Sequence, residues 1–186
     1  TFAELLSAFQ QATSHTQQRA TFSDSPSEKC GLWLAFETQR LMPQLTFSEK
    51  EQLRQFLSPQ DFQKSRIIGR FQIFYDTSGN DAPTILRYVD DDVEPIPGTA
   101  EEFVDSVGKF FNEVWSYEIE VLGYPAPPLN SSNLYTVNIR DFGLGYYGWT
   151  QFESEISPAP IPRYRTYIEI DNDFRWVYSS SKGIPG

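Results

Sequence analysis

The chain has 186 residues, and its 15 Lys and Arg against 25 Asp and Glu give a formal net charge of −10 at pH 7. Binding of nucleic-acid phosphates requires a basic surface, so this composition excludes DNA and RNA as expected partners. His15 is the single histidine and Cys30 the single cysteine, so the chain alone can build neither a two-histidine zinc site nor an internal disulfide. No apolar run reaches the length of a membrane span.

The first part of the chain has the pattern of short helices. Apolar residues recur at helical spacing over residues 2–9, 32–41 and 46–57. Ser48 is the expected N-cap of the third of these helices. We therefore expect a small helical leader over residues 1–65.

From residue 66 onward the pattern changes to strands around one long helix. Alternating apolar residues predict strands at 71–75, 134–140, 146–153 and 163–170. A broad apolar stripe predicts a helix over 99–122, with Thr99 and Glu102 as a capping box, and an acidic, Pro-rich loop is expected over 90–98.

This order of elements predicts an α+β fold, in which a mixed sheet of four to five strands is backed by the one long helix. The expected domain covers residues 66–178. Residues 179–186 carry no signal for a helix or a strand, and we expect them to form a flexible tail.

Several strings of this region, in this order, resemble a family of secreted bacterial zinc metalloproteases of the zincin type. They are Gly69–Gly79, Glu102–Val107, Glu118–Pro125, Leu134–Asp141, Gly145–Thr150 and Tyr167–Phe174. The resemblance implies that residues 66–178 form an incomplete zincin-like subdomain. It also implies that the leader is similar to a prodomain, and that the protein is secreted.

In that family the next element is a helix that carries His-Glu-x-x-His, whose two histidines bind zinc while the glutamate acts as a general base. This motif does not occur in the 186 residues. We therefore expect the chain to be the N-terminal part of such an enzyme and not catalytic by itself. Its expected partners are the missing C-terminal catalytic segment or a peptide substrate. A natural relative without catalytic activity is also compatible with the sequence.

Cys30 is the first candidate site residue. A lone cysteine in a helical leader is similar to the cysteine switch of zinc protease precursors, in which a thiolate fills the open zinc position and keeps the enzyme latent. The alternative is a structural cysteine packed among Leu32, Trp33 and Phe36.

An acidic cluster is the second candidate. Asp90, Asp91, Asp92 and Glu94 bring hard oxygen ligands together in the expected loop, a composition that suits calcium. Their spacing lacks the alternation that points such side chains inward, so a solvated acidic turn is the alternative.

An aromatic, glycine-containing segment is the third candidate. In the zincin architecture a strand at the position of Tyr147, Gly148, Trp149 and Thr150 lies along the cleft and pairs with an extended substrate. Gly148 would allow a second backbone to approach closely. The alternative is a hairpin strand whose aromatic side chains fill the core.

The second function class is a non-catalytic extracellular protein that reuses this fold for structure or self-assembly. Its support lies in the missing histidines, the 16% aromatic content and the acidic charge. Sheet edges without a covering element are templates for pairing with another copy.

Overall fold

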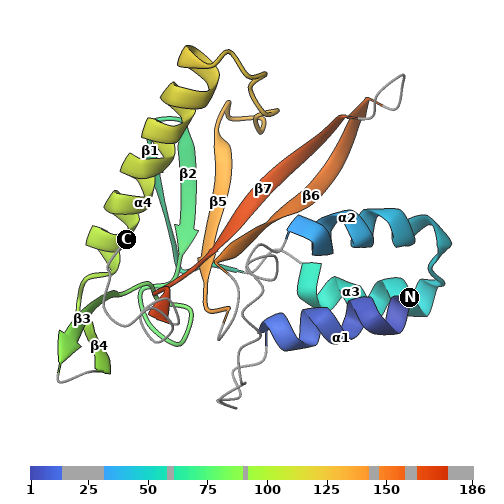
Figure 1. Cartoon of the computed structure of the whole chain (residues 1–186), viewed down its shortest axis with the longest axis horizontal. Helices are drawn as coiled ribbons and strands as arrows, with labels where there is room; N and C mark the ends of the chain where they lie inside the picture. The colour runs from blue at the N-terminus through green and yellow to red at the C-terminus, as the bar shows by residue number, and fades with distance from the viewer. Residues whose placement is uncertain (14–31, 58–60, 90–91, 143–146, 158–162, 176–186) are drawn as a thin grey trace.

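A computed structural model of the chain is drawn in Figure 1. The structure describes residues 1–13, 32–57, 61–89, 92–142, 147–157 and 163–175. Within these residues, no helix is both long enough and apolar enough to cross a membrane.

The described residues of the N-terminal region form three α-helices, as the sequence predicts. They are α1 (Phe2–Thr13), α2 (Leu32–Leu41) and α3 (Phe47–Leu57), with a short 3-10 turn, η2 (Met42–Gln44), between the last two. The predicted N-cap at Ser48 is wrong, because the capping box lies two residues earlier. The backbone N–H of Thr46 donates to the Glu49 carboxylate at 2.8 Å, and the N–H of Glu49 donates to the Thr46 hydroxyl at 3.3 Å.

The expected α+β class and mixed sheet are confirmed, and the described residues form a main sheet of five strands in the order β1-β2-β5-β7-β6. The strands are β1 (Lys64–Ile68), β2 (Phe71–Tyr75), β5 (Tyr135–Arg140), β6 (Gly148–Ser157) and β7 (Arg163–Asp171). The three inner strands are mutually parallel, whereas each edge strand runs antiparallel to its neighbour.

A separate hairpin corrects the predicted acidic loop. Strands β3 (Ile85–Val89) and β4 (Asp92–Ile96) pair antiparallel, so most of the segment expected to be a loop belongs to a strand. Pro95 is tolerated because a two-stranded sheet consists of edge strands, on which a missing N–H need not break a ladder.

The long helix α4 (Ala100–Trp115) continues into a π-helical turn, η3 (Ser116–Val121). Thr99 makes no capping box with Glu102. Its hydroxyl instead donates to the Ile96 carbonyl at 2.7 Å and accepts from the Ile85 N–H at 2.9 Å. This threonine therefore joins the β3–β4 hairpin to the start of α4.

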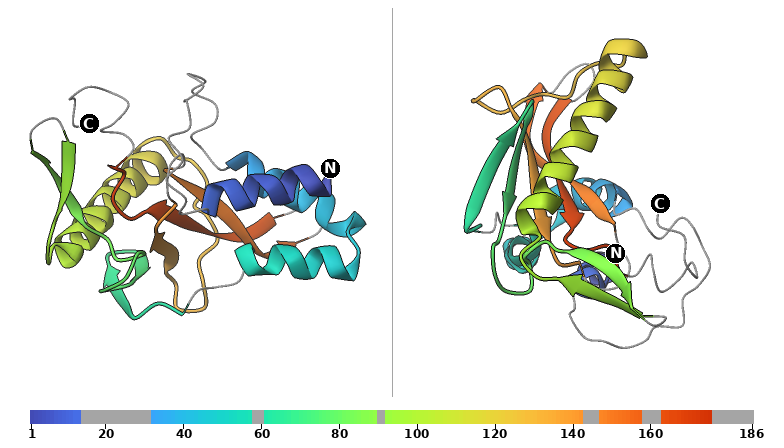
Figure 2. Two further views of the ribbon diagram at one scale, coloured as in Figure 1. Left: turned by 90° about the horizontal axis from the view of Figure 1, so that it is seen from below. Right: turned by 90° about the vertical axis from the view of Figure 1, so that its left-hand side faces the viewer.

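The buried residues of α4 share a hydrophobic core with β2 and β5, and the helix runs beside β1 and β2 (Figures 1 and 2). This core contains Phe71, Ile73, Tyr75, Phe103, Val104, Val107, Trp115, Tyr135, Val137 and Ile139. The burial follows from the period of two in the strands, which places every second residue on one face of the sheet.

Asn112 of α4 also holds the turn between β1 and β2. Its side-chain amide donates to the Ile68 carbonyl at 3.0 Å and accepts from the Arg70 N–H at 3.2 Å. Gly69 lies in this turn at φ 59°, and a Cβ there would come within 2.1 Å of the Asn112 oxygen. Only glycine fits both the dihedral angle and the close contact.

A second hydrophobic core joins the helical region to the sheet. It contains Leu5, Phe9, Leu41, Leu45, Leu53, Phe142 and Trp149. Residues of the expected leader therefore pack directly on Trp149 of β6 and on Phe142, which follows β5, at the opposite side of the sheet from β1 in Figure 1.

Candidate functional site

The start of β6 holds the four residues that the sequence singles out for substrate binding. Trp149 is only 3% exposed, and its ring lies 5.5 Å from Phe9 and 4.7 Å from Phe142. Thr150 is partly buried, whereas Tyr147 is 39% exposed. Trp149 thus lies in the core between the sheet and the helices, while Tyr147 reaches the surface.

Gly148 makes the close approach that the sequence suggests, but to a strand of its own chain. A Cβ at this position would lie 2.3 Å from the Glu169 carbonyl of β7. The glycine therefore allows β6 and β7 to come together at the point where β6 begins.

The predicted metal ligands fall mostly outside the described residues. This is the case for Cys30, Asp90 and Asp91, and of Asp92 the structure describes only the backbone, within β4. Glu94 pairs with Arg87 at 3.5 Å on the neighbouring strand. In the part of the chain that the structure describes, no three His, Cys, Asp or Glu side chains come together to hold a metal ion.

Sequence reasoning missed a row of buried polar side chains on the sheet face opposite α4. The strand register places Asn138 of β5, Glu169 of β7 and Trp149 of β6 side by side. All three are less than 9% exposed. Polar residues at alternating positions of two inner strands are the sequence signal that could have indicated this row.

Glu169 supplies the carboxylate of this row, and its side chain is only 3% exposed. The indole N–H of Trp149 donates to it, and the guanidinium of Arg140 lies 3.6 Å away. Burial raises the pKa of Glu169, while the Arg140 charge and the hydrogen bonds oppose that rise. The Arg140 Nε is buried without a hydrogen-bond partner among the described residues. The pair is therefore a buried and incompletely satisfied ionic contact.

Asp171, the last residue of β7, lies beside Arg140, the last residue of β5. Its carboxylate accepts the backbone N–H of Phe142 at 3.0 Å and that of Phe174 at 2.7 Å. Burial raises the pKa of Asp171 to about 7, and the charges of Asp173 and Asp141 act in the same direction. This aspartate fixes the chain where it leaves the two strands.

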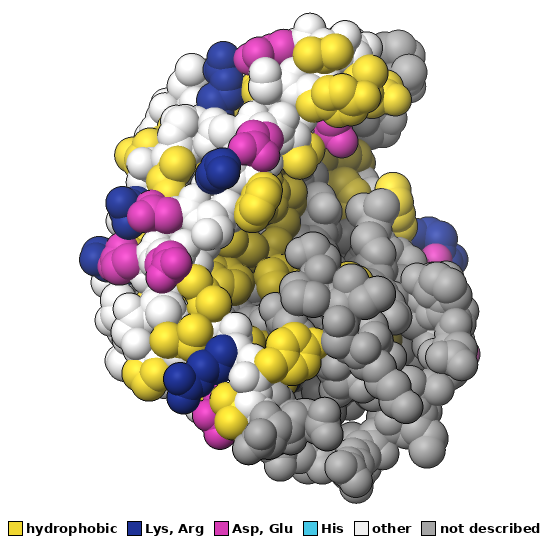
Figure 3. Space-filling view, turned by 60° about the vertical axis from the view of Figure 1, so that its left-hand side comes forward, with side chains coloured by type: hydrophobic (Ala, Val, Ile, Leu, Met, Phe, Trp, Pro, Cys, Tyr) yellow, Lys and Arg dark blue, Asp and Glu magenta, His cyan; other side chains and the backbone are white. Residues whose placement is uncertain are grey.

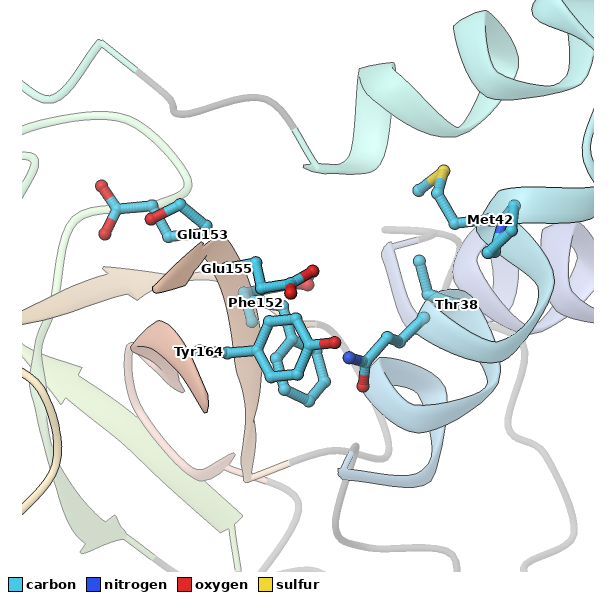
Figure 4. Close-up of a pocket in the computed structure, with 10 residues that line it drawn as sticks. Thr38, Met42, Phe152, Glu153, Glu155 and Tyr164 are labelled. Carbon is cyan, nitrogen blue, oxygen red and sulfur yellow. The ribbon is translucent and has the colours of Figure 1, made fainter. Parts of the chain in front are cut away.

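The edge strand β6 lines a cavity of about 330 Å³ that it shares with α2 and η2 (Figure 4). The lining residues are Thr38, Gln39, Met42, Pro43, Gln151, Phe152, Glu153, Ser154, Glu155 and Tyr164. We call this space the β6 cavity. It combines two carboxylates, two aromatic rings and a thioether, a lining suited to a cationic group on an apolar stem.

A second cavity, of about 280 Å³, lies on the sheet face opposite α4. Its walls are Phe62, Gln72, Phe74, Asn130, Thr136, Asn138, Glu153 and Tyr167. Glu153 lines both cavities, which are therefore neighbours across β6. Both offer groups for binding, and the described lining residues contain no cysteine or histidine that could act as a nucleophile or base.

Comparisons with protein-family models, with curated proteins and with solved structures found no match for this chain.

Proposed function

We propose that this chain is the helical leader and the sheet scaffold of a secreted zinc metalloprotease, whose zinc-binding helix belongs to a further segment of the same protein. The observation that carries this proposal is an apolar strip of sheet beside α4. Ile168 and Ile170 of β7 face the same side as the α4 core but are only partly buried. Such a strip supports the docking of another apolar element.

The dimensions of the sheet agree with this proposal. Five strands spaced about 4.8 Å apart make a sheet roughly 20 Å wide, whereas one helix covers about 10 Å. Helix α4 runs beside β1 and β2, and Figure 1 shows no described helix over β7 on this side. A second helix that follows β7 along the chain would fit the remaining width, as the resemblance implies for the zinc-binding helix.

The surface beside α4 has the chemistry that such a helix needs. A hollow of about 150 Å³ there is lined by apolar and aromatic side chains, among them Phe111, Trp115 and Ile168. Figure 3, which brings this side forward, shows hydrophobic side chains gathered on this part of the surface. The described residues hold no metal cluster of their own, so zinc ligands would have to come from elsewhere in the protein.

The position of the leader supports a latent form. Helix α2 packs against β6, which is an edge strand of the main sheet, and Phe36 contacts Phe152 of that strand with 6.2 Å between ring centroids. An extended peptide that pairs with the free edge of β6 would meet α2. In this proposal the leader therefore covers the strand along which substrate lies.

The test uses the natural protein, extended by the residues that follow Gly186 in its gene. We expect bound zinc by metal analysis and chelator-sensitive hydrolysis of unstructured peptides. Phe9→Asp should loosen the leader and raise hydrolysis, because Phe9 is fully buried against Trp149. Phe47→Asp is the matched control, since Phe47 is 79% exposed. Absence of both zinc and hydrolysis would refute the proposal, whereas activity unaffected by Phe9→Asp would refute only latency.

Cys30 can be tested in the same protein. If its thiolate fills the open zinc position, Cys30→Ala should raise hydrolysis before any processing of the leader. Equal latency of both proteins would refute the cysteine switch.

Self-assembly remains the second candidate because of one exposed surface. Phe110, Val114, Tyr117 and Val121 follow one face of α4 and η3, and their side chains are 50–69% exposed. Exposed apolar stripes of this kind are typical of contact surfaces. Sedimentation should then show concentration-dependent association that Val114→Lys weakens and Glu102→Lys, elsewhere on α4, does not. A monomer at every concentration would exclude this function.

A further inference from the structure

The β6 cavity has an acidic side chain next to aromatic rings. Glu155 follows Phe152 on β6, and the Phe152 and Tyr164 rings meet edge to face with 5.2 Å between their centroids. Met42 closes the opposite side from η2 (Figure 4). The rings and the thioether line the cavity together with the exposed Glu155 side chain.

One of the two carboxylates of this cavity, Glu155, has no matching cation among the described residues. No Lys or Arg of the described chain lies within ion-pair distance of Glu155. The other carboxylate, Glu153, lies 3.9 Å from Arg165 Nε. Among the described residues Glu155 therefore has no ion-pair partner, in a chain whose formal net charge is −10.

We propose that the β6 cavity binds an arginine side chain of a peptide. The guanidinium would donate to Glu155 and lie against the Tyr164 ring, while the three methylene groups would pack on Phe152 and Met42. Arginine fits better than lysine, because its planar group can stack on a ring and donate two parallel hydrogen bonds at the same time. A volume of about 330 Å³ leaves room for such a side chain.

The pocket has walls from both the leader and the sheet, so this binding goes beyond the proposed protease function and needs neither zinc nor hydrolysis. It can be measured on the 186-residue chain itself. A bound arginine would touch η2 and β6 together, and it would stabilise the packing of the leader on the edge strand.

The experiment compares acetyl-arginine amide with acetyl-citrulline amide by titration calorimetry. Citrulline keeps the shape of arginine but lacks its charge. We expect the arginine compound to bind at least about tenfold more tightly, and the difference to shrink as the salt concentration rises. Acetyl-lysine amide should fall between the two compounds.

Two variants identify the groups responsible. Glu155→Gln should reduce the affinity for arginine to that for citrulline, whereas Glu102→Gln, the same exchange on the exposed surface of α4, should leave it unchanged. Tyr164→Leu should weaken arginine and lysine binding together, with thermal melting as the check on folding. The proposal is overturned if arginine does not bind, if citrulline binds equally well, or if Glu155→Gln binds arginine like the natural chain.

Discussion

The two faces of the main sheet bury similar numbers of side chains, but the side chains differ in polarity. On the face toward α4, Ile73, Val137 and Ile139 are fully buried among other apolar groups. On the opposite face, Asn138 and Glu169 are buried almost as deeply, although both are polar. Residues 135–140 of β5 therefore alternate between two interiors of opposite character.

The difference teaches where the sheet is vulnerable. An apolar face loses stability gradually, in proportion to the atoms removed and the cavity left. The stability of a buried polar face depends on its ion pairs and hydrogen bonds. A buried charge that loses its counter-ion strongly destabilises the fold, because the interior has a low dielectric constant. Single substitutions should thus separate the two faces by both size and pH dependence of the effect.

Removal of Glu169 should have the largest effect. Glu169→Ala leaves the Arg140 guanidinium buried without its counter-ion, and we expect a loss of about 3–5 kcal/mol in the free energy of unfolding. Urea denaturation measures this loss. The double variant Arg140→Met/Glu169→Leu should recover most of it, since two apolar groups need no partners. A double variant as unstable as Glu169→Ala would show that the ion pair is not the cause.

The next effect is a dependence on pH that the apolar face cannot produce. Burial raises the pKa of Asp171 from 3.8 to about 7, so the folded chain binds this proton more tightly than the unfolded chain. The contribution of this group to the free energy of unfolding is therefore fully present below about pH 4. As the pH rises to 7, that contribution falls by up to about 4 kcal/mol.

Asp171→Asn tests this pH dependence, because asparagine does not titrate. Its unfolding free energy, measured by urea at each pH, should change less between pH 4 and 7 than that of the natural chain. The exposed Asp61→Asn is the matched control and should keep the full slope. An unchanged slope in Asp171→Asn would assign the pH dependence to other groups.

A smaller effect is expected where α4 crosses β1. A Cβ at Gly108 would lie 2.5–2.7 Å from atoms of Ile68, so Gly108→Ala should force the helix and the strand apart. We expect a loss of about 1–3 kcal/mol. Ile68→Ala makes space for the new methyl group. The double variant should therefore lose less free energy of unfolding than the two single variants lose in total. Simple additivity would contradict the contact.

The smallest effect belongs to the interior of the apolar face. Ile139→Val removes one methylene group from a fully buried side chain, and we expect a loss of about 0.5–1.5 kcal/mol at every pH. Thermal or urea unfolding at pH 4 and pH 7 should give the same difference. A difference that varies with pH would show that the two faces are coupled.

The fold could be predicted wherever its signal is local. The alternation of Phe71, Ile73 and Tyr75 predicts β2, and the apolar stripe after Thr99 predicts α4. Strand β1 could not be found in the same way, because Lys64–Ile68 lies at an exposed edge and depends on pairing with β2. Asp92 and Pro95 indicate a loop, and only the partner strand β3 makes their segment extended.

The candidate site was less predictable for the same physical reason. Glu169 and Arg140 alternate with apolar residues, which is also the pattern of a strand with one face in water. Their burial depends on strand neighbours and on helices that lie far away in the sequence, such as α1. The β6 cavity likewise joins Met42 to Glu155, which no spacing in the chain relates.

The contact of Asn112 with the turn after β1 has a consequence for the order of folding. The β1–β2 hairpin is a local structure, but its Arg70 N–H finds its acceptor in a residue 42 positions along the chain. The turn is therefore completed only when α4 docks, so hairpin and helix should open as one cooperative unit. Hydrogen exchange at the Arg70 amide should follow the exchange of the α4 core, and Asn112→Ala should accelerate it without unfolding the helix. If the Arg70 amide already exchanges fast in the natural chain, the β1–β2 hairpin opens independently of α4.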